Sequence, residues 1–175
     1  MKSQLLRAIE PEDLALLYEI ENDPLMWEFG GTHVPYSEYT LRQYIEQQTN
    51  DLNRDLQLRL AIVDPELPVE VSKRPAIGFA DLQNYDPLHN RAEVGIVLHG
   101  IYRGKGIATQ ALEALSCYAH EQFDIRVLYA IVAEGNASAL SLFRRTGFVE
   151  TCTLPSWIRV GQARKDAILF VRVFQ

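Results

Sequence analysis

The segment from Gly100 to Gly106 combines three glycines with two basic side chains, those of Arg103 and Lys105. It follows an apolar run and precedes a stretch with helical periodicity, so we expect a turn that leads from a strand into a helix. Glycines let the backbone come close to a ligand, and the free N–H groups and dipole of a helix start attract an anion. The segment therefore predicts a pyrophosphate site. The alternative is a glycine-rich turn whose basic side chains are only solvated.

Two common phosphate-binding motifs do not fit this segment. The dinucleotide-binding fingerprint needs a third glycine where this chain has Thr109. The P-loop needs a lysine directly after its second glycine, where this chain has Ile107, and its glycines are spaced differently. Neither motif therefore accounts for the predicted anion site.

The surrounding sequence predicts the elements that hold this segment in place. An apolar strand over residues 92–98 leads into it, and a helix over residues 104–122 follows. A strand at 127–133 and a helix at 136–145 come next. Further strands are expected at residues 5–8, 56–63, 76–82, 150–159 and 167–174, and further helices at 10–22 and 37–48.

This order of elements, β-α-α-β-β-β-α-β-α-β-β, predicts an α/β (α+β) fold. We expect a mixed, mostly antiparallel central sheet flanked by helices, with one β-α-β crossover in the second half. The chain has 175 residues, so a single domain over residues 1–175 is expected.

Composition argues against several classes of function. Hydrophobic residues make up 47% and charged residues 23% of the chain, as in ordinary globular proteins, and the formal net charge is -6. No basic stripe suits a nucleic acid, and no apolar run reaches the ~18 residues of a membrane span. The two cysteines and four histidines are scattered, so neither a disulfide framework nor a metal site is predicted. No apolar leader is visible at the start, and we expect a cytoplasmic protein.

Three segments in order resemble the motifs of one enzyme family. The run Arg103–Ala108 (RGKGIA) fits the acetyl-CoA-binding pattern Q/R-x-x-G-x-G/A. The run Asn136–Phe148 and the strand Ala92–Ile96 match two further motifs at the usual distances. Together they resemble the GNAT family of N-acetyltransferases, closest to its spermidine N-acetyltransferase and RimJ/RimL-like subgroups.

The resemblance implies an enzyme that transfers an acetyl group from acetyl-CoA to a primary amine by direct attack in a ternary complex, without a metal. The backbone of the strand before the glycines is implied to bind the pantetheine arm, as an added strand would. The amides of the glycine-rich turn are implied to hold the pyrophosphate. The residues implied to bind acetyl-CoA are Ile96, Val97, Leu98, Arg103, Gly104, Lys105, Gly106, Ile107, Ala108, Thr109, Asn136 and Phe143.

Asn136 carries two interpretations that are equally weighted. In the family, an asparagine here bonds the pantetheine arm or the region beside the thioester. Asparagine is also a common N-cap at the start of a helix. Both roles are compatible with each other.

Glu93 is the residue that we expect to act as the general base. Side chains alternate along a strand, so Glu93, Gly95 and Val97 share one face. An amine must lose a proton before it attacks a thioester, and the position matches that of the base in several family members. The alternative is a carboxylate at an edge or facing solvent that pairs with Arg91 or another basic residue.

Phe143 departs from the family pattern, because many members carry a tyrosine there that is thought to protonate the departing thiolate. A phenylalanine has no proton to give, although a thiol with a pKa near 8.5 is a tolerable leaving group unaided. Tyr102, Tyr118 and Tyr129 could take over the role, but packing is the simpler function for each. The departure also motivates an alternative, a non-catalytic acyl-CoA-binding or sensing module.

The sequence indicates less clearly which residues bind the amine acceptor. Members of the family build the acceptor site from the loop between the first two helices and from the penultimate hairpin, so the resemblance implies segments 23–36 and 154–164 here. The candidate acceptor ligands within them are Glu28, Tyr36 and Trp157. The carboxylate attracts an ammonium group, and the aromatic rings wall a slot or stack on a cation. A polyamine, another small amine and a protein N-terminus are all candidate acceptors. The apolar last strand, residues 168–174, is either a homodimer contact or ordinary core.

Overall fold

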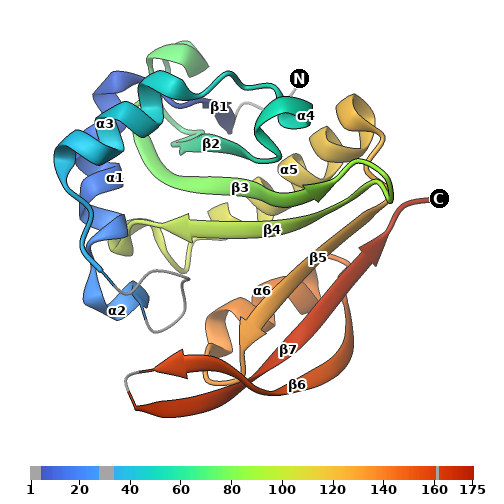
Figure 1. Ribbon diagram of the computed structural model, residues 1–175. Helices are drawn as coiled ribbons and strands as arrows, with labels where there is room; N and C mark the ends of the chain where they lie inside the picture. The colour runs from blue at the N-terminus through green and yellow to red at the C-terminus, as the bar shows by residue number, and fades with distance from the viewer. Residues whose placement is uncertain (1–4, 28–33, 161) are drawn as a thin grey trace.

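A computed structural model of the chain describes residues 5–27, 34–160 and 162–175. Within these residues seven strands form one sheet in the order β1-β2-β3-β4-β5-β7-β6 (Figure 1). Neighbouring strands are antiparallel except β4 and β5, which are parallel, so the predicted mixed, mostly antiparallel sheet is confirmed. The strands are β1 (Leu6–Ala8), β2 (Leu58–Val63), β3 (Ala76–Asp86), β4 (Arg91–Leu98), β5 (Val127–Ala133), β6 (Val149–Val160) and β7 (Ala163–Val173).

Helices cover both faces of this sheet (Figure 1). α1 and α3 pack on one face, and α5 and α6 pack on the other. No helix in the described part of the chain is long and apolar enough to cross a membrane. The helices are α1 (Leu14–Glu21), α2 (Pro24–Trp27), α3 (Glu38–Gln47), α4 (Leu52–Asp55), α5 (Ile107–Phe123) and α6 (Ala137–Arg145), with 3-10 turns η1 (Pro11–Asp13), η2 (Val71–Lys73) and η3 (Gly100–Tyr102).

Strand alternation decides which residues of the sheet meet which helices. On β4, Val94 and Leu98 belong to the same buried cluster as Leu112 and Leu115 of α5. Val97 points the other way and packs in a second cluster under α1 and α3. The sheet is therefore the middle of three layers, and β4 presents a different set of side chains to each outer layer.

Among the differences from the sequence prediction, two boundaries and one additional helix have a direct physical reason. α5 begins at Ile107 rather than at residue 104, because the two glycines before it take a left-handed backbone. β3 extends past residue 82 to Asp86, since it continues beyond an irregularity in its pairing with β4. The single-turn helix α4 was not predicted, and the side chain of Asp51 caps it.

Candidate functional site

The parallel neighbours β4 and β5 pair over a short stretch. Arg91–Glu93 lie beside Val127–Tyr129, and no further residue of either strand is paired with the other, although both are fully described. Figure 1 shows the two strands diverging beyond this point. Residues 94–98 of β4 therefore leave one backbone edge unpaired over about 17 Å, at the usual rise of a strand.

The antiparallel register of β3 and β4 decides which groups face this free edge. His99 donates its amide N–H to the carbonyl of Ile77 over 2.9 Å, and hydrogen-bonded and non-bonded pairs alternate along an antiparallel ladder. By that alternation the backbone of Val97 bonds to β3, whereas the N–H and C=O groups of Ile96 and Leu98 point away from it. Of the three predicted pantetheine contacts, those of Ile96 and Leu98 fit the free edge, and that of Val97 does not.

The glycine-rich turn lies at the end of this edge. Gly104 and Gly106 have φ angles of 76° and 79°, and a Cβ atom at either would meet nothing within 4 Å. Gly106 is the N-cap of α5, and its carbonyl accepts a bond from the amide of Gln110. The amides of residues 107–109 lie before the first intrahelical bond, so they have no partner within the helix. This open backbone with free donors fits a pyrophosphate group.

The two basic side chains of the turn fold back on the protein. Arg103 donates its Nε–H to the carbonyl of Leu98 over 2.9 Å, and one of its terminal nitrogens lies 3.3 Å from Sδ of Met26. The Lys105 Nζ lies 5.4 Å from the centroid of the Tyr102 ring, a cation–π contact. Both basic residues are exposed. Their positive charge attracts anions, and the backbone amides of the turn attract them as well.

Glu93 lies where β4 and β5 part. On its other side β3 carries a bulge, because the register shifts between Gln83 and Asp86 and Asn84 takes a φ of 51°. Bulges commonly re-aim a side chain, and here Nδ2 of Asn84 donates to Oε2 of Glu93 over 2.8 Å. Arg91 pairs with Asp86 rather than with Glu93, which is half-buried and has no ion pair within the described residues. The ion pair between Glu93 and Arg91 that the alternative predicts is therefore not observed, and the role of Glu93 as the base stays a prediction.

Asn136 serves as the N-cap of α6. Its Oδ1 accepts the amide of Ala139 over 3.1 Å and the hydroxyl of Ser138 over 2.9 Å. Its Nδ2 has no hydrogen-bond partner in the described part of the chain. The capping role is confirmed, and it leaves the amide nitrogen available for the second predicted role.

Phe143 is part of the hydrophobic core. Its side chain is 4% exposed and packs edge-on against Phe148 and stacked on Phe170, with ring centroids 5.1 and 5.7 Å away. A contact with acetyl-CoA stays a prediction for this residue. The phenylalanine supplies no proton at a position where the family pattern has one.

The predicted acceptor residues lie on separate elements. Glu28 is outside the described residues. Tyr36 is half-buried and held by Asn22, which accepts its amide N–H over 2.7 Å and donates to its carbonyl over 3.1 Å. Trp157 is 56% exposed on the edge strand β6. Their roles as acceptor ligands stay predictions.

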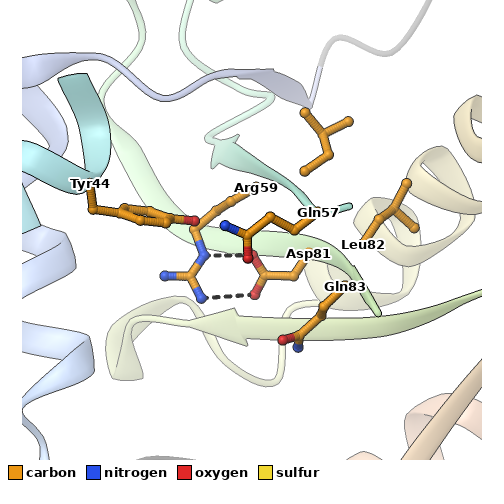
Figure 2. Close-up of a pocket in the computed structure, with 7 residues that line it drawn as sticks. Tyr44, Gln57, Arg59, Asp81, Leu82 and Gln83 are labelled. Carbon is orange, nitrogen blue, oxygen red and sulfur yellow. Dashed lines mark hydrogen bonds and ion pairs between the residues drawn. The ribbon is translucent and has the colours of Figure 1, made fainter. Parts of the chain in front are cut away.

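A polar cluster on the same sheet face as Glu93 was missed at the sequence level. Arg59 of β2 donates to Asp81 of β3 over 2.5 and 3.2 Å, and to Glu21 of α1 over 2.6 Å. Figure 2 shows Arg59 and Asp81 facing each other, with the ring of Tyr44 reaching in from α3. They line a small open pocket of about 190 Å³, counting the solvent at its mouth. The available signal was a single charged residue within each of two apolar stretches, Leu58–Val63 and Ala76–Leu82.

Burial and the charges within this cluster shift the pKa values of Tyr44 and Arg59. Burial raises the pKa of Tyr44 above 10.0, and the carboxylates of Asp81 and Glu21 raise it further against the opposing charge of Arg59. Burial disfavours the charged form of Arg59, but the charge and hydrogen bonds of Asp81, together with Tyr44 and Glu21, more than offset this and hold the arginine pKa above its usual value. Two carboxylates therefore face one permanently charged guanidinium, beside a phenol that keeps its proton.

Comparison with known proteins places the chain among acetyltransferases. Residues 4–149 match the family model of the acetyltransferase (GNAT) domain. A spermidine N(1)-acetyltransferase of Escherichia coli K12 is 26% identical over 144 residues, which cover 82% of this chain and 71% of that protein. A putative ribosomal N-acetyltransferase of Bacillus subtilis 168, YdaF, is 30% identical over 173 residues, covering 94% of this chain and 88% of that protein.

One solved structure shows the same fold. It is the spermidine N-acetyltransferase from Vibrio cholerae in complex with CoA and spermine, with a TM-score of 0.83 at 22% identity over 98% of this chain and 96% of that one. These relatives and this neighbour are acetyltransferases, and none of them supports the alternative of a non-catalytic binding module.

Proposed function

Because the chain belongs to the GNAT acetyltransferase family, we propose that it transfers an acetyl group from acetyl-CoA to a primary amine at the point where β4 and β5 part. One juxtaposition carries this proposal. The free edge of β4 has the glycine-rich turn at one end and Glu93 at the other. An acyl donor anchored on the turn and laid along the edge brings its reactive end to the carboxylate.

Backbone groups do most of the binding in this account. The amides between Arg103 and Thr109 hold the pyrophosphate, because a helix start with free N–H groups favours an anion. The pantetheine arm pairs with the backbone of Ile96 and Leu98 in the manner of an added strand. Nδ2 of Asn136 donates a further hydrogen bond to the arm.

The reaction starts from an ammonium group, whose pKa of about 10.4 keeps it protonated near neutral pH. Glu93, held by Asn84, takes that proton directly or through a water molecule, and the freed amine attacks the thioester carbonyl. Negative charge then develops on the carbonyl oxygen, and an amide on the free edge of β4 stabilises it. Leu98 offers such an amide, whereas the other expected donor, Val97, turns its amide toward β3.

We infer that the acceptor is a small cationic amine such as a polyamine. On the face that Glu93 shares with β2 and β3, the carboxylates of Asp81 and Glu21 outnumber the guanidinium of Arg59. A negative field beside the base attracts a substrate that carries several ammonium groups. The spermidine N-acetyltransferases among the relatives are named for such an acceptor.

A protein N-terminus is the second candidate acceptor. One relative, whose match covers 94% of this chain, is named a putative ribosomal N-acetyltransferase. A peptide and a polyamine both present a primary amine to Glu93, so the chemistry of the base does not separate them. Their discrimination depends on surfaces away from the reacting atoms.

The test is release of free thiol from acetyl-CoA by the purified protein. The acceptors are spermidine, putrescine, aminoglycosides, free amino acids and peptides with varied N-termini, each against a sample without acceptor. We expect the highest kcat/KM with a polyamine. If only peptides give a rate, the acceptor is a protein N-terminus and not a polyamine. No rate with any amine, while acetyl-CoA still binds, contradicts the proposed transfer.

We also propose a homodimer that forms through the outer residues of β7. Phe170 is fully buried core, but Val171 and Val173 alternate with it and share a face with Val149 of β6. Val173 and Val149 are each 67% exposed, and α6 packs on the opposite face. One structure of the Vibrio cholerae enzyme is dodecameric. We expect sedimentation to show a wild-type dimer and a Val173→Glu monomer, and a monomeric wild type contradicts the proposal.

A further inference from the structure

Tyr129 of β5 is the register partner of Glu93 of β4. Paired residues on neighbouring strands point to the same face, and the strands lie about 4.8 Å apart. This is the last pair before the strands part. Both side chains therefore stand at the same end of the free edge, opposite the end that holds the glycine-rich turn.

The surroundings of Tyr129 keep its phenol protonated. Burial raises its pKa above 10.0, and the negative charge of Glu93 raises it further. Of the other charged groups near it, Asp86 adds to this effect and Arg91 opposes it. The hydroxyl has no hydrogen-bond partner in the described residues and is not sealed from solvent.

The other two tyrosines considered for a proton role lie elsewhere. The ring of Tyr102 sits under the Lys105 ammonium, at the far end of the β4 edge. Tyr118 lies on α5, partly buried against the core, and packs edge-on against Phe123 of the same helix, with ring centroids 5.5 Å apart. Of the three, Tyr129 alone stands beside the base.

Resting on the proposed acetyl transfer, we propose that Tyr129 is a catalytic residue that donates its phenolic proton to the departing CoA sulfur. A donor is needed because breaking the C–S bond leaves a thiolate, and the buried Phe143 has no proton to give. A general acid must hold its proton at the working pH, and it donates that proton more readily as its pKa approaches that pH.

The neighbouring Glu93 returns a proton to Tyr129 at the end of the reaction. It first takes the amine proton and becomes a carboxylic acid. When the tetrahedral intermediate collapses, the C–S electron pair goes to sulfur, which takes the proton of Tyr129 and leaves a tyrosinate. Glu93 then returns its proton to the tyrosinate, directly or through water. The attacking nitrogen loses its second proton to water before the intermediate collapses, so of the two protons that the ammonium gives up, one ends on the thiol and one in solvent. Neutralising Glu93 also removes a charge that holds the Tyr129 pKa high, so the phenol is a stronger acid when the thiolate leaves.

The first test compares Tyr129→Phe with the control Tyr118→Phe in the thiol-release assay. We expect Tyr129→Phe to lower kcat about 100-fold, with the KM for acetyl-CoA changed less than twofold. The control keeps the wild-type kcat. Full activity of Tyr129→Phe beside an active wild type overturns this inference, whereas an inactive wild type overturns the proposed function instead.

A second test separates proton donation from a structural role. In acetyl-seleno-CoA, selenium replaces the thioester sulfur, and a selenol is more acidic than a thiol, so its anion leaves without a proton. We expect the kcat defect of Tyr129→Phe to shrink to a few-fold with this donor. We also expect the solvent deuterium isotope effect on the wild-type kcat to be smaller with acetyl-seleno-CoA than with acetyl-CoA. This second measurement needs no variant. An equal defect with both donors, or an unchanged isotope effect, overturns the inference.

Discussion

The left-handed backbone at Gly106 sets the direction of the first amides of α5, on which the proposed pyrophosphate site depends. A residue with a Cβ atom costs about 1–2 kcal/mol in this conformation. We expect Gly106→Ala to lower the free energy of unfolding by roughly this amount and, as the amides shift, to weaken acetyl-CoA binding about tenfold. Calorimetric titration and thermal unfolding measure the two effects.

Gly100 offers the matched control for this prediction. A Cβ atom there also meets nothing within 4 Å, but Gly100 is not among the glycines with a positive φ. Gly100→Ala is therefore expected to keep both the stability and the acetyl-CoA affinity of the wild type. Equal affinities in the two alanine variants would show that the backbone conformation at Gly106 has no part in binding.

Helix α6 begins at a residue with two separable functions. Oδ1 of Asn136 caps the helix, and Nδ2 is the atom proposed to bond the pantetheine arm. An aspartate accepts the same capping bonds but has no amide to donate. We expect Asn136→Asp to keep the melting temperature and raise the KM for acetyl-CoA several-fold.

Asn136→Ala completes the comparison, because it removes both functions. It is expected to lose about 1 kcal/mol of stability as well as affinity. If the aspartate variant keeps the wild-type KM, Asn136 is a cap and nothing more. Thermal unfolding and steady-state kinetics on both variants decide between these outcomes.

Local sequence patterns predicted the elements around the proposed acetyl-CoA site well, because their signals are short-range. The glycines before α5 and the asparagine before α6 are helix start signals, which act within a few residues. The partner of Glu93 was out of reach. Asn84 meets it through a bulge in β3, and a bulge depends on how two strands pair rather than on either strand alone.

The same limit applies to groups that meet across the fold. Arg59, Asp81 and Glu21 come from two strands and a helix, and nothing local to any of them indicates the others. The proximity of Tyr129 to Glu93 likewise follows from the register of the parallel pair. The alternation of side chains along a strand predicts on which face of the sheet Glu93 lies. Which residues of the neighbouring strands lie beside it on that face can be known only from the order of the strands in the sheet.

The Arg59 cluster links the stability of the entire fold to pH. The native pKa of Tyr44 lies above its unfolded value of 10.0, mainly because the phenol is buried. Above pH 10 the unfolded chain releases this proton while the native chain retains it, so the unfolded state binds fewer protons and the free energy of unfolding falls as the pH rises.

Tyr44→Phe removes this contribution, since phenylalanine does not titrate. We expect the free energy of unfolding of the variant to fall less steeply than that of the wild type between about pH 9 and pH 11. Tyr39→Phe, at an exposed position of the same helix, is the control and is expected to keep the wild-type slope. Urea unfolding across this range gives the slopes, and identical slopes for wild type and Tyr44→Phe would rule out the linkage.

The most direct test of the account compares wild type, Glu93→Gln and the control Glu121→Gln, an exposed glutamate of α5. Thiol release gives kcat with the best acceptor across pH, and calorimetry gives the acetyl-CoA affinity. We expect a kcat about 100-fold lower for Glu93→Gln at neutral pH and an acetyl-CoA affinity within twofold of the wild type. The control is expected to behave as wild type in both measurements. A Glu93→Gln variant that keeps the wild-type kcat at every pH would show that Glu93 is not the base.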